Sequence, residues 1–316
     1  MEYIHCPLCE ADDTKFLFTR KDFTHRVSDV EFIVVRCKKC GMVYLNPRPD
    51  QEEIHSYYPE EFYEITSKEE LLRIKEQSLQ AKYEMVKHIE TGELLDVGCN
   101  KGEFLFFMHE KGWRVRGVEF SSKPPNVFNQ NIFYGELEAA HFNDNSFDLV
   151  TLWAVLEHVN DPLGTLREIN RILVPGGTLV ALVTNFNSIP GRFLRHDDIP
   201  RHMNMFTRKT MSKMLQVAGL KASAFSFNQD IFDGSVRGML NYLTKLSFGE
   251  KLASIVEQNR SRDRWYEFSS TLNGTESEFM KRIDALDMRI TPFLNGVLDF
   301  LHLGFIMIVE AKKETT

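Results

Sequence analysis

Four of the five cysteines form two pairs with the same spacing. Two residues separate Cys6 from Cys9, and two separate Cys37 from Cys40. A gap of two residues lets one tight turn place both sulfurs at about 2.3 Å from a common ion, and two such turns complete a tetrahedral shell of four thiolates. Gly41, directly after Cys40, favours the left-handed turn that such a site commonly needs. A closed shell has no open position for a substrate, so the spacing predicts a structural zinc ion, Zn²⁺.

Two other interpretations of these cysteines remain open, namely a redox pair and four unrelated buried thiols. A redox pair needs only one CxxC motif at the start of a helix, whereas this sequence has two matched pairs. The fifth cysteine, Cys99, belongs to a different motif, where we expect it to be a small neutral filler. Zinc is therefore the favoured interpretation of the four-cysteine set.

A second group of informative residues follows a hydrophobic run. Residues 94–98, Leu-Leu-Asp-Val-Gly, predict a buried strand that ends in a glycine turn, and Gly102 opens the next predicted helix. Gly98 permits a turn with positive φ, and Gly102 lets a ligand approach unpaired backbone N–H groups at the helix start. The next predicted strand ends at Glu119, where a carboxylate can bind both hydroxyls of a ribose.

The same turn lacks the features of two common phosphate sites. A dinucleotide fingerprint has a second close glycine, which is absent between Gly98 and Gly102. A Walker loop continues with Lys and Ser or Thr, whereas Glu103 follows Gly102. The turn therefore favours an adenosyl ligand that has no phosphate chain.

Two histidines are candidates for acid–base chemistry. His158 follows a predicted strand, and His202 lies between Pro200 and Phe206, after the next strand. An ordinary imidazole titrates near neutral pH, so either side chain could take a proton from an alcohol. A structural histidine bonded to a loop carbonyl remains the alternative for both. Five basic residues are expected around the same region, either as a solvated face or as a site for a charged substrate: Arg192, Arg195, Arg201, Arg208 and Lys209.

Strands and helices alternate in the part of the chain that must position these residues. The pattern predicts strands at 93–98, 114–118, 132–134, 147–153 and 178–184, helices at 102–110 and 162–173, and further strands at 222–227 and 304–311. A helix at 71–89 precedes them. Such alternation predicts an α/β fold with a mostly parallel sheet covered on both faces, and ligands beyond the carboxyl ends of its strands.

Five ordered motifs between Leu94 and Thr184 resemble those of the class I S-adenosylmethionine-dependent methyltransferases. They are Leu-Asp-Val-Gly-Cys-Asn-Lys-Gly, Gly-Val-Glu-Phe-Ser, Asn145–Val150, Val155–Pro162 and Leu173–Leu179. The cysteine pairs, Asn46-Pro47-Arg48-Pro49 and the segment Pro200–Phe206 resemble the branch of that superfamily with an N-terminal zinc ribbon. One departure is Asn100-Lys101, where many members have a second Gly or Ser.

The resemblance implies a Rossmann-like, seven-stranded methyltransferase sheet with S-adenosyl-L-methionine as cofactor. Asp96, Gly98 and Gly102 would line the methionine half of the cofactor, with Cys99 in the same loop, and Glu119 would hold the ribose hydroxyls. Glu136 and Leu137 would border the adenine, and Trp153 would lie on the sulfonium side unless it packs in the core. His202 and His158 would be the catalytic candidates.

Five parts of the chain are expected. They are a zinc-ribbon module at 1–47, a linker and leading helix at 48–90, the cofactor-binding core at 91–230, a helical insertion or lid at 231–302, and the last strand with a tail at 303–316. The aromatic segment 51–66 should pack the ribbon onto the core or cover a ligand. The apolar stretch 293–301 should pack on the sheet, with contact to a bilayer surface as the less favoured alternative.

Composition narrows the classes of function. The chain has 316 residues, 43% of them hydrophobic and 26% charged, which excludes a disordered protein. Its net charge of −7 disfavours a protein that coats nucleic-acid phosphates. The first ten residues have no cationic stretch before an apolar run, and residues 290–309 are interrupted by polar side chains, so we expect a cytoplasmic protein without a membrane span.

These observations predict methyl transfer from S-adenosylmethionine to a small molecule, with an oxygen of a sugar or of a glycan or lipid precursor as the expected acceptor. A base methyltransferase for ribosomal RNA is one alternative, which the net charge disfavours. A non-catalytic scaffold is another, which the intact set of Asp96, Gly98, Gly102 and Glu119 disfavours. The sequence does not predict the oligomeric state.

Overall fold

The computed structural model describes residues 1–22, 25, 27–59, 67–121, 124–188, 198–227, 285–286, 289–290, 293–294 and 296–315. Most of the predicted helical insertion at 231–302 lies outside these residues, as do Arg192, Arg195 and the aromatic pair Phe62 and Tyr63. The described residues contain the sheet, the cysteine pairs, the glycine turn and both candidate histidines.

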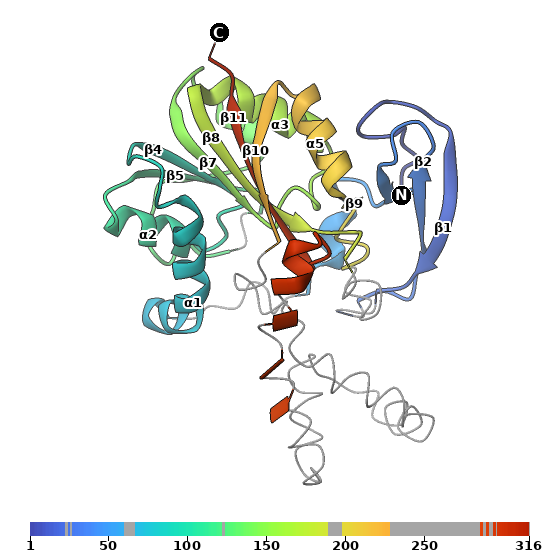
Figure 1. The fold of residues 1–316 in the computed structure, drawn as a ribbon, viewed down its shortest axis with the longest axis horizontal. Coiled ribbons are helices and arrows are strands. Elements are labelled where there is room, and N and C mark those ends of the chain that lie inside the picture. Colours follow the sequence, from blue (N-terminus) through green and yellow to red (C-terminus); the bar gives the residue numbers. More distant parts are fainter. Residues whose placement is uncertain are drawn as a thin grey trace.

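A seven-stranded sheet forms the centre of the molecule (Figure 1). Its strands, in spatial order, are β10 (Leu220–Ser226), β11 (Ile306–Lys313), β8 (Leu173–Thr184), β7 (Phe147–Trp153), β4 (Glu93–Val97), β5 (Arg114–Glu119) and β6 (Ile132–Tyr134). The pairs from β8 to β6 are parallel, whereas β11 runs antiparallel to both β8 and β10. The predicted Rossmann-like α/β sheet with seven strands is therefore confirmed.

Helices cover both faces of this sheet, as its two-sided burial requires. On one face lie α1 (Lys68–Val86) and α2 (Glu103–Glu110), and on the other lie α3 (Pro162–Ile172) and α5 (Arg208–Val217) (Figure 1). Successive residues of β4 enter the two cores, because Leu94 packs with the α1 and α2 side and Leu95 with the α3 and α5 side. The continuous apolar run of β4 follows from this arrangement.

Side-chain caps set where these helices begin. Ser67 accepts a hydrogen bond from the Glu70 amide at the start of α1, and Asp161 accepts one from the Gly164 amide at the start of α3. Thr207 and Thr210 form a capping box at the start of α5. The start of α2 differs, because its first residue follows Gly102 in a left-handed conformation, with no side-chain cap. That exception is the glycine turn of the predicted cofactor site.

The cysteine module has its own antiparallel sheet, in the order β1 (Thr14–Arg20), β2 (Phe32–Cys37), β3 (Val43–Leu45) and β9 (Asn204–Met205). The last of these strands, β9, comes much later in the chain, between β8 and β10 of the central sheet (Figure 1). Val43 pairs with Met205 and Tyr44 with Asn204. The N-terminal ribbon sheet is thus completed by the segment that carries His202.

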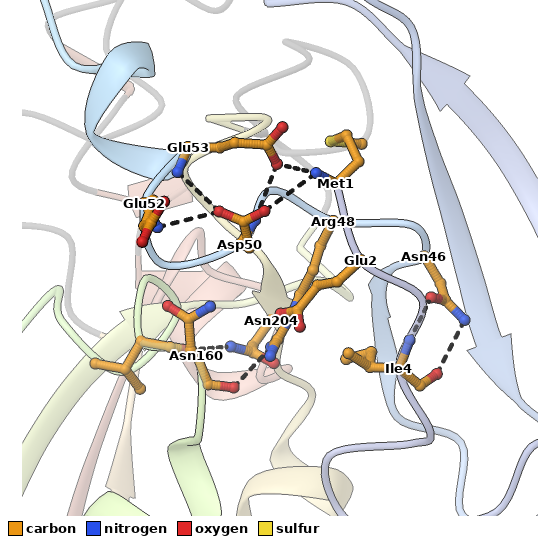
Figure 2. A network of polar contacts seen from close by, with 11 residues as sticks. Met1, Glu2, Ile4, Asn46, Arg48, Asp50, Glu52, Glu53, Asn160 and Asn204 are labelled. Carbon is orange, nitrogen blue, oxygen red and sulfur yellow. Dashed lines mark hydrogen bonds and ion pairs between the residues drawn. The ribbon is translucent and has the colours of Figure 1, made fainter.

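Arg48 is a second connection between the ribbon and the core (Figure 2). Its Nε donates to Glu2 Oε1 at 2.8 Å, and its Nη1 donates to the carbonyl oxygen of Asn160 at 2.6 Å. Asn46 exchanges two hydrogen bonds with the backbone of Ile4. The Asn46-Pro47-Arg48-Pro49 motif is therefore a tie between the N-terminus, the ribbon and the loop after β7.

The stretch 293–301 only partly follows the expectation that it packs on the sheet. Leu298 is buried, whereas Phe293 and Phe300 are 72% and 83% exposed. Among the described residues, no helix has the length and apolar character that crossing a membrane requires.

Candidate cofactor and acceptor site

The structure brings the four cysteines of the two pairs together. The Sγ atoms of Cys6 and Cys40 are 3.4 Å apart, those of Cys9 and Cys37 are 3.6 Å apart, and all four lie within 4.8 Å of one another. A tetrahedral zinc site with bonds of about 2.3 Å has sulfurs about 3.8 Å apart. The donor type, the number of donors and the spacing therefore fit a closed zinc site.

The turn between β4 and α2 has the geometry that its glycines predict. Gly98 has φ of +73°, and a Cβ built there would lie 2.4 Å from Val155 Cγ2. The Gly98 and Cys99 amides both donate to the Val118 carbonyl, at 2.7 and 3.0 Å, which draws the turn against the end of β5. Gly98 is required both for its backbone conformation and for the close approach of the loop after β7.

Asp96 lies buried at the carboxyl end of β4. Its Oδ1 accepts a hydrogen bond of 2.7 Å from Thr151 Oγ1 on β7. Burial raises the pKa of Asp96 to about 7, although Lys82 on α1 and the Thr151 hydroxyl act in the opposite direction. The carboxyl group is thus balanced between its two protonation states near neutral pH.

Glu119 ends β5 with its carboxylate directed at the same turn. Its Oε2 accepts from the Asn100 amide at 2.7 Å and its Oε1 accepts from the Ser121 amide at 3.1 Å. Burial raises the pKa of Glu119, against the effect of these backbone donors. Asn100, where the motif departs from the family pattern, has φ of +49° and helps to hold this carboxylate.

Three other predicted cofactor residues, Cys99, Glu136 and Leu137, differ in their exposure. Cys99 packs its sulfur against β5, where a Cβ on Gly117 would be 2.6 Å from it. Glu136 accepts a hydrogen bond of 2.6 Å from Gln51 Nε2, and Leu137 is fully buried in the core. Cys99 is thus a small filler, as expected, and of the predicted adenine neighbours only Glu136 presents a polar side chain outside the core.

Trp153 ends β7 between an aromatic neighbour, Phe104, and a charged one, Lys82. The ring centroids of Trp153 and Phe104 are 5.4 Å apart in an edge-to-face contact, and the Lys82 ammonium lies 5.3 Å from the Trp153 ring centroid. Two buried polar atoms, Trp153 Nε1 and Glu103 Oε2, have no hydrogen-bond partner among the described residues. Buried donors and acceptors are rarely left unpaired in a folded protein, so these atoms fit a region that binds a polar ligand.

The sequence did not single out Lys82. It lies on α1, and burial lowers its pKa, although Asp96 and Glu103 act in the opposite direction. A single lysine within a helix does not reveal in the sequence that it lies beside a ligand site, because only the fold places it near Asp96 on β4 and Trp153 on β7.

The two predicted histidines come from separate segments and are in contact. The ring centroids of His158 and His202 are 4.6 Å apart with planes at 80°. His158 follows the loop that touches Gly98, since its amide donates to the Val155 carbonyl at 2.9 Å. His158 is therefore one turn of chain from Val155, the residue that packs against Gly98.

The two imidazoles differ in their partners. The Tyr58 hydroxyl lies 3.1 Å from His158 Nδ1, and the main chain of Arg201 also bonds to the His158 ring. Burial and the neighbouring His202 lower the pKa of His158 to about 3. Burial also lowers the pKa of His202, which Asp198 opposes. Both rings are therefore neutral at pH 7, and His158 is the more fully engaged of the two.

Glu157 is a buried residue of this region that the sequence did not single out. Its Oε1 accepts from the Thr184 amide at 3.2 Å, and its Oε2 has no partner among the described residues. Burial raises the pKa of Glu157 to about 7. Its carboxylate and the rings of His158 and His202 offer three ligand atoms within 4.8 Å of one another, but Nδ1 of His158 already lies 3.1 Å from the Tyr58 hydroxyl.

The expectation that Arg201 belongs to a cluster of basic residues at the surface is wrong. Its side chain is fully buried and paired with Asp22 and Asp198, so it does not present a charge to solvent. Arg208 and Lys209 are exposed on α5. A guanidinium already neutralised by two carboxylates is not available to bind an anionic substrate.

Comparisons with known proteins agree with this architecture. Residues 69–224 match the family described as a methyltransferase domain. The demethylmenaquinone methyltransferase of Staphylococcus aureus (strain MRSA252) is 34% identical over 107 residues, which are 30% of this chain and 44% of that protein. The chain therefore spans less than half the length of the curated relatives it matches.

Solved structures at low identity are also similar to this chain. A SAM-dependent methyltransferase from Archaeoglobus fulgidus is 16% identical with a TM-score of 0.47, over 77% of this chain and 98% of that one. A chain from the complex of the Haloferax volcanii Trm112 methyltransferase activator with a methyltransferase is 16% identical with a TM-score of 0.48, over 78% and 93%.

The family match covers the residues that form the glycine turn, Glu119 and the loop after β7. It also contains all five motifs between Leu94 and Thr184. Residues 69–224 therefore form a methyltransferase domain, in agreement with the resemblance of the five motifs to the S-adenosylmethionine-dependent methyltransferases.

Proposed function

We propose that the protein transfers the methyl group of S-adenosylmethionine to an oxygen of a small-molecule acceptor, a hydroxyl of a sugar or of a glycan or lipid precursor. The observation that carries this proposal is the contact of two neutral imidazoles, the buried His202 and the half-buried His158, beside the loop that packs on Gly98. An alcohol must lose its proton during the in-line displacement, and a neutral imidazole within reach can accept it.

His202 is the better candidate for the base. The Tyr58 hydroxyl and the Arg201 main chain engage the ring of His158, which leaves it to orient its neighbour. Burial keeps His202 unprotonated at neutral pH, so it is ready to accept a proton. His158 would then hold the ring of His202 by the edge-to-face contact at 4.6 Å.

The cofactor would be held by residues at the carboxyl ends of β4, β5 and β7. We assign Asp96, Gly98, Cys99 and Gly102 to the methionine half, with Cys99 acting through its backbone. Glu119 would bind the ribose, Glu136 would border the adenine with Leu137 as its buried support, and Trp153 would lie near the sulfonium. Trp153 Nε1 and Glu103 Oε2, which have no hydrogen-bond partner in the described part of the chain, support a polar ligand in this region. The bound cofactor supplies the electrophilic methyl group.

The four cysteines would hold one structural zinc ion. The close spacing of the four sulfurs supports this assignment. Four thiolates complete the tetrahedral shell and leave no open coordination position, which is why the role would be structural. Four reduced thiols are typical of a reducing compartment, which favours the cytoplasm.

Three observations favour a small acceptor over RNA. The net charge is −7, and Arg201, one of the five expected basic residues, is buried in ion pairs with Asp22 and Asp198. The curated relative is named a demethylmenaquinone methyltransferase, and menaquinone precursors are small molecules. Neither a nucleic-acid partner nor a membrane contact is part of the proposal.

The test uses S-adenosylmethionine with an isotopically labelled methyl group. The protein is incubated with a panel of free and nucleotide-linked sugars, a quinol and ribosomal RNA. The methylated acceptor and the demethylated cofactor are then measured by mass spectrometry. We expect label in a hydroxyl-bearing small molecule, and a loss of about 10²- to 10⁴-fold in rate for His202→Ala. His109→Ala, at an exposed position on α2, is the matched control. Unchanged turnover in both His202→Ala and His158→Ala would show that neither is the base, and labelled RNA alone would overturn the acceptor class.

A further inference from the structure

The segment that carries His202 is bound to the zinc ribbon on its C-terminal side. The Leu45 amide of β3 donates to the Met203 carbonyl at 3.0 Å, and the next two residues form β9 in the ribbon sheet. The Met203 and Asn204 amides donate to the Glu157 carbonyl at 2.9 and 3.1 Å. One short segment therefore connects the ribbon to the loop that carries His158.

On its N-terminal side, His202 follows the buried residue Arg201. The Arg201 guanidinium bonds to Asp22, with Nη2 to Oδ1 at 2.7 Å, and to Asp198, with Nη2 to Oδ1 at 2.7 Å and Nε to Oδ1 at 2.9 Å. Asp22 belongs to the ribbon, in the connection between β1 and β2, and its side chain is fully buried. An ion pair thus joins the ribbon to the residue before His202, across 179 positions of sequence.

The same guanidinium also reaches the aromatic segment. Its Nη1 donates to the carbonyl oxygen of Tyr57 at 2.6 Å, and the next residue, Tyr58, places its hydroxyl 3.1 Å from His158 Nδ1. Arginine presents five donors in a rigid planar fork, so one side chain can fix several acceptors at once. Arg201 is therefore bonded to three separate segments that converge on the two histidines.

We propose that Asp22 and Arg201 are positioning residues of the methyl-transfer site, through which the zinc ribbon sets the place and the electrostatic surroundings of His202 and His158. This inference rests on the proposed role of His202. Among the residues that the structure describes, the charged and titratable groups facing His202 are Asp198, Arg201, His158 and Glu157, and His25 Nε2 lies 3.8 Å from Asp198 Oδ1. Asp22 acts on them through Arg201, because its carboxylate offsets part of the guanidinium charge.

The consequence is that a change in the ribbon alters the histidines without touching the cofactor turn. In Asp22→Asn the side chain keeps its size and one acceptor oxygen but loses its charge. The Arg201 charge is then less compensated beside His202, which disfavours the imidazolium form. Asp13→Asn is the matched control, because Asp13 lies in the same module in an exposed ion pair with Lys38.

The experiment is a titration of the histidine rings by NMR in the full-length protein, with His202→Gln used to assign the signals. We expect the titration midpoint of His202 in Asp22→Asn to move down by about one pH unit, with changed ring signals for His158. Zinc content and affinity for S-adenosylmethionine should match wild type, and the transfer rate should fall about tenfold or more. Asp13→Asn should leave all of these quantities unchanged.

Identical histidine signals and midpoints in Asp22→Asn and wild type would overturn the proposal. If Asp22→Asn does not fold, Arg201→Lys replaces it, because lysine keeps the charge but loses the fork. Loss of the bound zinc in both variants would show that the contacts only hold the ribbon together, and would also overturn the proposal. The outcome is independent of the proposed function: full turnover in His202→Gln would refute the base, whereas the ring titration would still report the coupling.

Discussion

Glu119 shows how the local backbone prepares a side chain for a ligand. The Asn100 and Ser121 amides hold its two oxygens at 2.7 and 3.1 Å, so the carboxylate has a defined direction before any ribose binds. We expect Glu119→Ala to weaken the affinity for S-adenosylmethionine by about 1 to 3 kcal/mol, the range for loss of a charged partner. Calorimetry of the variant beside Glu110→Ala, an exposed control on α2, checks this expectation. Equal dissociation constants for Glu119→Ala and wild type would place the ribose elsewhere.

The pKa of His202 predicts the pH dependence of the reaction. Burial lowers this pKa below the ordinary value for histidine, so the ring is unprotonated throughout the neutral range and gains a proton only in acid. Because the base must be unprotonated, the transfer rate should stay level around pH 7 and fall only on the acid side of the ordinary histidine range. A pH profile of the rate measures this limb. A profile that falls instead between pH 7 and 8 would contradict a buried neutral base.

Residues within one turn were predictable from the sequence, whereas contacts between distant segments were not. Gly98, Gly102 and Glu119 follow from the local requirements of a strand, a turn and a helix. Arg201 was expected among exposed basic residues, because its partner Asp22 lies far away in sequence. The contact of His158 with His202 depends on the same long-range packing.

At the scale of elements, alternation of strands and helices predicted the central sheet because parallel strands buried on both faces form continuous apolar runs. β9 was not predicted, since its two residues are too short to show any periodicity. That short strand nevertheless completes the ribbon sheet. The expected division into a ribbon and a core therefore omits the segment that joins them.

Removal of zinc should act first on the ribbon. We expect about one zinc ion per chain in the purified protein, and its loss in Cys6→Ser, because a closed shell of thiolates contributes folding free energy. Hydrogen exchange should rise in β1, β2 and β3 and in the paired strand β9, while the strands beside the glycine turn stay protected. Metal analysis that finds no zinc, together with four freely titratable thiols in the native protein, would contradict the zinc site.

At the scale of the whole molecule, buried polar ties hold the ribbon against the methyltransferase core. Arg48 contacts Glu2 and the Asn160 carbonyl, and its side chain is 9% exposed. We expect Arg48→Met to lower the free energy of unfolding by about 1.5 to 3 kcal/mol, the range for hydrogen bonds to a charged group. Arg73→Met is the control, since Arg73 is in a surface ion pair on α1 with a side chain 72% exposed, where the effect should stay below about 1 kcal/mol. Equal losses in urea unfolding would show that the tie is not specific.

Binding of S-adenosylmethionine at the turn between β4 and α2 underlies every assignment of this site, and titration calorimetry of the cofactor into the protein measures it. We expect one S-adenosylmethionine to bind per chain in the wild type and no detectable binding in Gly98→Val, where even the Cβ would lie 2.4 Å from Val155. Gly112→Val shares the positive φ but has open space around it, so it should bind like the wild type. Absence of binding in the wild-type protein, or equal binding in Gly98→Val and Gly112→Val, would show that this turn is not the cofactor site.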